Sequence, residues 1–381
     1  MKYIPLKDVC KINMGQSPDS SSYNEIEKGI PFFQGNADFG ERYPIARVWC
    51  NAPTKIAQPE DILISVRAPI GALNYAKEEC CIGRGLAALT PDKNKVSLEF
   101  IYWLLKGKNA ELNHKGTGST FKAISRNVLE EIMVPVVDYE KQHEYAEILE
   151  KIYTIIHKRK EELHLLDNLI KARFVEMFGD PVQNTEGWDT DTCKNLTSKI
   201  GSGATPKGGR ESYGTEGISL IRSMNVYNNL FEYRDLAYIT DEQADKLSNV
   251  TIEEKDVLLN ITGASVARCC LVPEELIPAR VNQHVAIIRC KDRLLPEFLC
   301  NIFTEDSYQR LLWNIATSGG ATREAITKQQ IEDLVLIVPP IELQQQFVEF
   351  CNQVDKSKVA VQKALDETQL LFDSLMQQYF G

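Results

Sequence analysis

The sequence predicts a mixed α/β protein in which one module occurs twice, each copy consisting of a head and a long C-terminal helix. Three observations support this prediction: the chain resembles itself at a period near 200 residues, apolar runs of strand length occur early in each copy, and the end of each copy is a long segment free of Pro and Gly. The predicted fold class is therefore α/β (mixed α+β) heads in tandem repeat, joined by two long α-helices that form a coiled coil.

Length and composition are those of a globular protein with more than one domain. The chain has 381 residues, of which 43% are hydrophobic and 25% charged, and roughly 100–200 residues form a typical domain. No apolar run reaches the ~18 residues of a membrane-spanning helix, and the N-terminus lacks an apolar signal-peptide core. We therefore expect a cytoplasmic protein that has no contact with a membrane.

Ten cysteines are dispersed along the chain without a Cys-x-x-Cys spacing. Disulfide scaffolds are short and dense in cysteine, and zinc sites need closely spaced pairs of ligands. The vicinal pairs Cys80-Cys81 and Cys269-Cys270 are interpreted as small apolar strand residues, and no metal is expected.

The offset between the two copies varies in the early part of the repeat and is constant in the late part. Asp61–Ser65 matches Asp256–Asn260, and from Thr120 onward the offset is constant at 202 residues, so that Thr120 matches Thr322. Because the offset drifts only in the earlier part, insertions are tolerated in the first ~120 residues of each copy and not in the last ~60.

The elements follow in order from apolar patterning and from Gly and Pro. Strands are predicted at residues 61–66, 256–261, 281–288 and 334–338, and helices at residues 98–106 and 296–312. After Pro135 and Pro339, long helices are predicted, because each following segment runs for about 37 residues without Pro or Gly. The resulting boundaries are residues 1–140 (first head), 141–180 (central long helix), 181–341 (second head) and 342–381 (C-terminal long helix).

Both long helices carry an apolar residue pattern of seven-residue period, which is typical of a left-handed coiled coil. The seam residues of the two helices are Leu149, Ile152, Ile156, Leu163, Leu166, Ile170 and Met177, and Val354, Val361, Leu365, Phe372 and Leu375. At 1.5 Å per residue each helix is about 55 Å long, too long to bury its seam against one small head. The two helices are therefore predicted to pack against each other, and two independent core helices are the alternative.

Sequence signatures of enzymes are missing. Residues 116–120 do not meet the phosphate-loop spacing, no Gly-x-Gly-x-x-Gly follows a strand, and the histidines form no metal-ligand spacing. The Asn-Gln-His step at Asn282–His284 is interpreted as a turn or a satisfied strand edge. We predict no catalytic residues and no cofactor.

Charge at first argues against nucleic acid, because the chain carries a net charge of −10. Residues 1–186 have 24 basic and 26 acidic groups, and residues 187–381 have 19 and 27. Any contact with DNA must therefore come from local patches or with the help of a partner.

Side chains that can read base edges are nevertheless gathered in the Gly-rich loops of both heads. Backbone N–H groups of such loops also hold phosphates without added charge. For each residue alone, a solvated polar group is the simpler interpretation, and the clustering is the stronger argument. The candidate DNA-binding residues are Gln16, Ser17, Gln34, Asn36, Arg67, Arg84, Thr120 and Lys122 in the first copy, and Thr205, Lys207, Arg210, Arg222, Asn225, Thr262, Arg268, Asn282, Gln283, Thr322 and Arg323 in the second.

A set of motifs, doubled in the same order across nearly the whole chain, carries a family resemblance. The motifs are Gly15–Pro18 and Gly201–Pro206, Ile218–Asn225, the strands that begin at Asp61 and Asp256, Asn282–Ala286, Ser318–Thr322 and the helix start Pro339–Gln344. In these motifs the chain resembles a specificity subunit of a type I restriction-modification enzyme. The first copy departs from the pattern at Gly15-Gln16-Ser17, where Gly-Gly-Thr is commoner, and at Gly83-Arg84-Gly85, where Asn-Gln is expected.

The resemblance implies a fold and a function. The heads would be two target-recognition domains, separated by long helices that pack antiparallel. Each domain would read one half of a bipartite double-stranded DNA site. Methyltransferase subunits would dock on the helices, and a restriction/translocase subunit would join through the complex. Two alternatives stay open at this point: a coiled-coil scaffold with protein-binding heads, and a stand-alone nuclease or methyltransferase.

Overall fold

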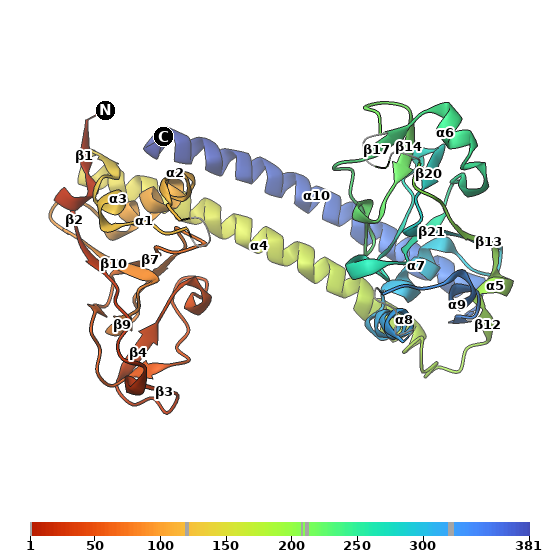
Figure 1. The fold of residues 1–381 in the computed structure, drawn as a ribbon, viewed down its shortest axis with the longest axis horizontal. Coiled ribbons are helices and arrows are strands. Elements are labelled where there is room, and N and C mark those ends of the chain that lie inside the picture. Colours follow the sequence, from red (N-terminus) through yellow and green to blue (C-terminus); the bar gives the residue numbers. More distant parts are fainter. Residues whose placement is uncertain (1, 119–121, 207–208, 210–212, 319–323) are drawn as a thin grey trace. The chain divides into compact units, whose positions relative to one another are not determined.

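The structure is a computed structural model that describes residues 2–118, 122–206, 209, 213–318 and 324–381. The chain divides into two compact units. Unit 1 contains residues 1–161 and 362–381, and unit 2 contains residues 162–361. Helix α4 (Tyr139–Phe178) begins in unit 1 and ends in unit 2, and α10 (Ile341–Phe380) runs from unit 2 back into unit 1 (Figure 1).

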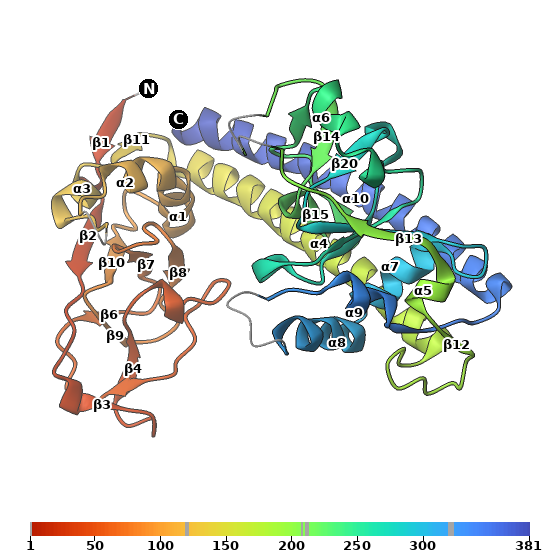
Figure 2. The same ribbon diagram turned by 45° about the vertical axis from the view of Figure 1, so that its right-hand side comes forward.

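Unit 1 holds the first head as short strands and short helices. The strands are β1 (Tyr3–Pro5), β2 (Cys10–Met14), β3 (Tyr23–Asn24), β4 (Ile30–Phe33), β5 (Trp49–Cys50), β6 (Ile56–Ala57), β7 (Ile62–Ser65), β8 (Leu73–Tyr75), β9 (Cys80–Ile82), β10 (Leu86–Pro91) and β11 (Met133–Pro135), and the helices are α1 (Leu98–Gly107), α2 (Asn109–Lys115) and α3 (Arg126–Glu130). They form sheets in the orders β2-β10-β7-β8, β3-β5-β4-β9-β6 and β1-β11. The helices lie on the side of β10 and β7, away from β3 (Figure 2).

Unit 2 holds the second head, with the same kind of sheets. Its strands are β12 (Thr190–Thr192), β13 (Thr197–Ser202), β14 (Ile218–Ile221), β15 (Val226–Tyr227), β16 (Leu230–Phe231), β17 (Ala237–Ile239), β18 (Val257–Asn260), β19 (Cys269–Leu271), β20 (Ala279–Val281), β21 (Val285–Cys290) and β22 (Val335–Ile337), and its helices are α5 (Cys193–Leu196), α6 (Asp241–Asp245), α7 (Pro296–Thr304), α8 (Asp306–Thr317) and α9 (Lys328–Glu332). The sheet orders are β13-β21-β18-β19, β17-β14-β20, β12-β22 and β15-β16. Both heads are therefore mixed α/β, as predicted.

The repeat extends to individual backbone hydrogen bonds. The Leu6 N–H donates to the Ile132 carbonyl in the first head, and the Cys193 N–H donates to the Leu334 carbonyl in the second, both at 2.8 Å. In each head one parallel strand pair, β4–β9 or β14–β20, accompanies an antiparallel four-stranded sheet. The self-similarity in the sequence is thus a repeat of one fold.

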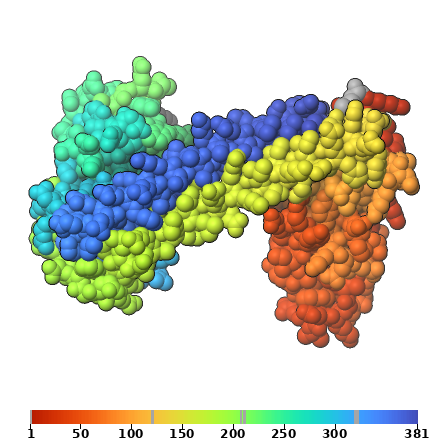
Figure 3. Space-filling model, turned by 180° about the vertical axis from the view of Figure 1, so that it is seen from behind, coloured from red at the N-terminus to blue at the C-terminus, as the bar shows by residue number. Residues whose placement is uncertain are grey.

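Each unit contains a stretch of both long helices, and side chains join the two stretches. In unit 1 the Tyr145 and Tyr379 rings stack with centroids 3.9 Å apart, and Arg159 donates to Thr368. In unit 2 the Lys358 ammonium lies 2.7 Å from an Asp167 carboxylate oxygen. Early residues of α4 thus contact late residues of α10 and the reverse, and the helices lie side by side on the surface of each unit (Figure 3). Every predicted seam residue is buried or half-buried.

Aromatic side chains fix the helices to each head. In unit 1, Trp103 of α1 packs edge-on against Phe372 of α10, with centroids 5.7 Å apart, and Phe100 contacts Phe380. In unit 2, Phe178 of α4 packs against Phe298 of α7 at 4.8 Å. Buried aromatic pairs of this kind combine large apolar area with specific geometry.

The vicinal cysteines lie in strands, in agreement with their interpretation as apolar residues. Cys80 and Cys81 belong to β9, Cys269 and Cys270 belong to β19, and all four side chains are buried. Burial raises the pKa of Cys80 to about 12, because desolvation disfavours the thiolate. The thiol form dominates at neutral pH, so Cys80 is not a ready metal ligand or nucleophile.

Two predicted elements are interrupted in the structure. The helix expected at 296–312 is two helices, because the backbone of Glu305 is extended and its carboxylate accepts the Ser307 N–H at 2.7 Å as an N-cap for α8. The strand expected at 281–288 is divided into β20 and β21 by the turn Asn282–His284, in which the Asn282 side chain accepts the His284 N–H.

A buried glutamine near the start of each long helix holds the loop that precedes α1 in unit 1 or α7 in unit 2. Gln344 is fully buried, its Oε1 accepts the Leu295 N–H at 2.9 Å, and its Nε2 donates to the carbonyls of Arg293 and Pro339. Gln142 makes the equivalent bonds in unit 1, with the N–H of Ser97 and the carbonyl of Lys95. Gln142 and Gln344, which are separated by the constant offset of 202 residues, therefore make the same structural contacts in both units.

Replacing Gln344 by Met is expected to lower the free energy of unfolding of unit 2 by about 2–4 kcal/mol, because buried backbone groups lose their partners. Urea denaturation followed by fluorescence measures this change. The exposed neighbour Gln345 provides the control, since Gln345→Met removes no buried hydrogen bond. A Gln344→Met variant as stable as the control would contradict the structural role.

Candidate nucleic-acid interface

Candidates in the first head lie where several strands end on the same side of the sheets. Gln16 and Ser17 follow β2, Gln34 follows β4, Arg67 follows β7 and Arg84 follows β9. The strand ends are joined by backbone hydrogen bonds, from the Gln16 N–H to the Ile82 carbonyl, from the Gly83 N–H to Phe33 and from the Val66 N–H to Gly85. The fold thus brings these side chains together from distant parts of the sequence.

The turn Gly83-Arg84-Gly85 is the centre of this edge. The Arg84 N–H donates to the Ser17 hydroxyl at 3.3 Å. A Cβ on Gly85 would lie 2.2 Å from the Gln34 carbonyl oxygen, so only glycine permits this close approach of the backbones. Arg67 pairs with Ala123 in an isolated β-bridge, and Lys122 directly precedes Ala123 in the chain. Gln34, Arg67 and Lys122 are exposed, as an interface with a ligand requires.

Asn36 is the remaining described candidate of the first head. It begins a short 3-10 turn, Asn36–Asp38, two residues beyond Gln34, and it is half-buried. The Asp38 carboxylate accepts the Gln34 N–H at 2.7 Å and so fixes this turn at the end of β4.

The second head has a chain of polar side chains at the equivalent edge. The Thr205 hydroxyl contacts the Gln283 side-chain oxygen, the Gln283 amide nitrogen lies 3.1 Å from His284 Nε2, and His284 Nδ1 lies 2.6 Å from the Thr262 hydroxyl. The loops after β13, β18 and β20 supply these residues. Thr205 and Gln283 are exposed, which leaves them able to meet a ligand.

The asparagine candidates of this head lie in the interior. Asn225 is fully buried, and its amide bonds to backbone groups of Arg222, Glu232 and Arg234. Asn282 is 4% exposed and holds the turn before β21 through the His284 N–H. Both side chains therefore shape the loops around the edge.

The two described arginine candidates of the second head lie on aromatic rings. The Arg268 guanidinium stands 4.4 Å from the centroid of Tyr227, and Arg222 stands 5.3 Å from that of Tyr213 while donating to the Asp235 carbonyl. Cation–π stacking orients such guanidinium groups and leaves donors at their edges. Five further candidates lie outside the described residues: Thr120, Lys207, Arg210, Thr322 and Arg323.

A hydroxyl contact recurs at corresponding positions of the two heads despite the sequence departures of the first copy. Ser17 meets the backbone of Arg84, and Thr205 meets the side chain of Gln283, at corresponding places after β2 and β13. Gly15 and Gly203 are also equivalent, since a Cβ on either would lie within 2.2 Å of a carbonyl oxygen, that of Gly83 or that of Val281. The departures thus change the side chains and keep the architecture of the edge.

His284 is the residue of this edge that the sequence did not identify. Its ring joins Thr262 to Gln283, although it was interpreted as part of a turn or satisfied edge. The interpretation as a turn is correct, and the ring has the additional role of bridging two candidate side chains. The available signal was the run of three polar residues between two apolar strands.

Within residues 2–118, 122–206, 209, 213–318 and 324–381, no three His, Cys, Asp or Glu side chains are grouped so as to hold a metal ion. In the same residues, no helix combines the length and the apolar character needed to span a bilayer.

Known proteins match nearly the whole chain. The model of the family "Type I restriction modification DNA specificity domain" matches residues 1–165 and again residues 185–368. The putative type I restriction enzyme MjaX specificity subunit of Methanocaldococcus jannaschii is 46% identical over 153 residues, which cover 40% of this chain and 36% of that relative. The MjaIX specificity subunit of the same organism is 22% identical over 400 residues, covering 97% of this chain and 90% of that relative.

A solved structure shares the fold. The type I restriction-modification system S subunit from M. genitalium superposes with a TM-score of 0.62 at 14% sequence identity, covering 100% of this chain and 96% of that chain.

Proposed function

Because this chain belongs to the family of type I restriction-modification specificity subunits, we propose that each of its heads reads one half of a bipartite double-stranded DNA site. Specificity subunits are non-catalytic, so the expectation of no enzyme activity in this chain is confirmed by its family. The observation that carries the proposal is the equivalent edge in both heads, where strand-end loops gather polar side chains.

The chemistry of the two edges suits readout of base edges. Amide and hydroxyl groups of Gln34, Thr205 and Gln283, and the guanidinium groups of Arg67 and Arg84, are donors or acceptors of the kinds that discriminate base pairs in the major groove. Since the two edges differ in side chains, they are expected to read different half-sites. With a net charge of −10, DNA binding must come from such local contacts or with the help of a partner.

We assign the long helices two roles in this function. They form an antiparallel coiled coil that sets the gap between the half-sites, and they are the docking surface for methyltransferase subunits, through which a restriction/translocase subunit joins. The contacts of Tyr145 with Tyr379 and of Lys358 with Asp167 support the antiparallel direction. The corresponding domains are residues 1–140 and 181–341 for recognition and residues 141–180 and 342–381 for the helices, in a protein of the cytoplasm.

Methylation mapping tests this function directly. DNA from cells that carry this chain with its methyltransferase partner is expected to be methylated at a split sequence of two half-sites with a fixed gap. Cells that carry the methyltransferase alone are the control and should lack this methylation. Methylation or cleavage of DNA by the isolated chain, or methylation at an uninterrupted sequence, would contradict the proposal.

Gln283→Ala is expected to reduce discrimination at one base pair of the second half-site by roughly 10- to 100-fold, the range of one paired contact to a base edge. Competition binding with duplexes substituted at each position measures the change. Gln345→Ala is the control, because Gln345 is exposed and belongs to α10 and not to the loops after β13, β18 and β20. Equal loss at all positions would assign Gln283 to the phosphate backbone, and loss in the first half-site would contradict independent reading.

A further inference from the structure

A hollow of about 600 Å³ in unit 2 is bordered by three lysines, and its lining includes none of the candidate DNA-binding residues that the structure describes. Its wall follows the edge strand β13 from Thr197 to Ser202, which pairs on one side with β21. The remaining lining comes from α5, α9 and the segment Asn249-Val250. Lys194, Lys199 and Lys328, together with Glu332, are called the basic cluster of the second head.

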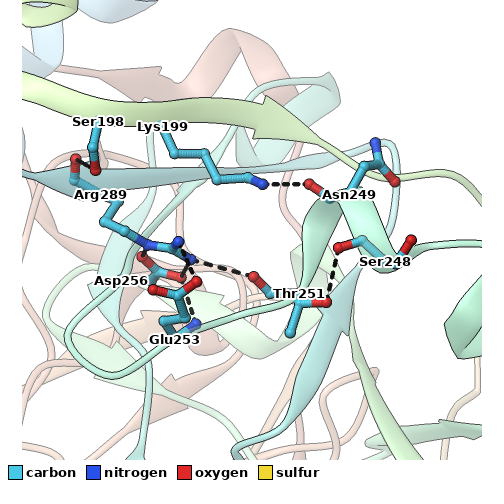
Figure 4. Close-up of polar contacts among 8 residues, drawn as sticks. All are labelled: Ser198, Lys199, Ser248, Asn249, Thr251, Glu253, Asp256 and Arg289. Atoms are coloured by element: carbon cyan, nitrogen blue, oxygen red, sulfur yellow. Dashed lines mark hydrogen bonds and ion pairs between the residues drawn. The ribbon is translucent and has the colours of Figure 1, made fainter.

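Two lysines of the cluster share one partly buried carboxylate. The Glu332 side chain is 16% exposed, and its oxygens lie 3.7 Å from the Lys194 ammonium and 3.6 Å from that of Lys328. Lys199 reaches across the hollow to the Asn249 carbonyl (Figure 4). The Glu332 carboxylate positions Lys194 and Lys328. Because their side chains are 66% and 64% exposed, their remaining N–H donors face solvent. The four residues carry a net charge of +2.

The same set of charges occurs at the corresponding positions of the first head. Lys7 directly follows Leu6, whose N–H donates to the Ile132 carbonyl. In the same way Lys194 directly follows Cys193, whose N–H donates to the Leu334 carbonyl. Lys11 occupies the place of Lys199, one residue before Ile12 and Ile200 on β2 and β13. Arg126 and Glu130 of α3 stand where Lys328 and Glu332 stand in α9, and they form an ion pair of 2.6 Å. The charges thus recur while the reading side chains differ.

We propose that each basic cluster binds the phosphodiester backbone of DNA beside the half-site that its head reads, an inference that rests on the proposed function. A contact repeated in both heads regardless of the bases read is what backbone contacts provide, since phosphates carry no sequence information. The chain from Lys199 on β13 reaches Thr205, in the loop after this strand, within at most roughly 20 Å of extended chain. Such a span corresponds to about six base pairs along a duplex.

The lining of the hollow favours phosphate over an acidic protein surface. The exposed Ser202 hydroxyl adds to the three ammonium groups, whereas the hydroxyls of Thr197 and Ser198 donate to the carbonyls of Cys193 and Arg289. The apolar lining residues Ile200 and Val250 are 8% and 1% exposed, and among the residues that the structure describes no aromatic side chain borders the hollow. Protein interfaces gain most of their affinity from aromatic and apolar anchors at the centre, and these are missing from this lining.

The salt dependence of DNA binding tests the proposal. The full chain and its triple variant Lys194→Gln, Lys199→Gln, Lys328→Gln are titrated with two duplexes of equal length, one carrying the sequence selected from a random library and one scrambled. Each lost phosphate contact should lower the slope of log affinity against log salt by about 0.9, so the triple variant should lose about 2–3. Both duplexes should bind about 10- to 100-fold more weakly at ~0.1 M salt, with their affinity ratio unchanged.

A charge-matched control separates a local site from the net charge. Lys171, Lys246 and Lys255 lie on other parts of unit 2, and each pairs with a carboxylate, of Asp306, Glu242 and Glu297 respectively. Their triple change to Gln should alter the slope by less than about 1. The variant Lys7→Gln, Lys11→Gln, Arg126→Gln should lose as much as the cluster variant, because the clusters are equivalent. Thermal melting verifies that every variant is folded.

Each outcome decides one of the two proposals. An unchanged slope in the cluster variant overturns the phosphate site. Normal DNA binding with loss of the co-purifying methyltransferase subunit would also overturn it and identify a protein-docking surface. If the wild-type chain shows no preference between the two duplexes, the proposed function fails, while the slopes on the scrambled duplex still decide whether the cluster holds phosphates.

Discussion

Exchange of residues 190–335 for the corresponding head of another specificity subunit is expected to replace one half of the recognised DNA sequence and to leave the other half unchanged. This exchange begins at β12 and ends at β22, and both strands belong to one small sheet at the base of the second head.

 
The exchange carries Thr205, Thr262 and Gln283 together, so the hydrogen-bonded chain that joins them through His284 is transferred intact.

Methylation mapping or selection from a random duplex library measures the outcome. A base pair in the wrong context typically costs about 1–3 kcal/mol, so a half-site of several base pairs should switch preference by several orders of magnitude. The matched control exchanges the same residues for those of a subunit that already reads the same second half-site, and it should leave the whole sequence unchanged. A change in both halves would show that the heads read DNA jointly.

Insertion of four residues into both long helices is expected to widen the preferred gap by one to two base pairs. Four residues after Lys160 add about 6 Å to α4, and the facing insertion in α10 follows Ala364, whose carbonyl accepts a hydrogen bond from Arg159. Base pairs rise 3.4 Å each, which gives the expected shift. The bases read within each half should stay the same, because no reading loop has changed.

Binding to a series of duplexes that differ only in gap length measures this shift. An insertion after Lys160 alone is the comparison, and its shift should be smaller if α10 slips by a heptad to restore the apolar seam, because packing repeats every seven residues. Paired insertions that keep the original gap with full activity would limit the helices to a docking role.

The sequence was sufficient to predict the repeat, the long helices and the class of each head. The constant offset and the long segments without Pro and Gly are properties of the chain itself, and the burial of Leu149 and Phe372 agrees with the predicted seam. The break at Glu305 could not be predicted in the same way, because no Gly or Pro marks it. It depends on a local carboxylate cap.

The candidate interface was predictable by residue type and only partly by role. Asn282 and Gln283 are neighbours of similar chemistry, yet one is 4% exposed and the other lies on the surface. Their difference arises from the turn between β20 and β21, which the apolar pattern joined into one strand. The basic cluster was missed because Lys194, Lys199 and Lys328 come together only through the packing of α9 beside β13.

Unit 1 consists of two separate segments of the chain, and this has a consequence for synthesis on the ribosome. Its apolar contacts include Phe372 and Phe380, which belong to the final residues of the chain, whereas unit 2 is continuous from residue 162 to residue 361. At about 5–20 residues per second, translation of the intervening segment takes on the order of 10–40 seconds. During that time Phe100 and Trp103 of the nascent first head lack their partners. The unit that is started first is therefore the last to be completed, and a nascent chain that stops early leaves an apolar surface open to chaperones.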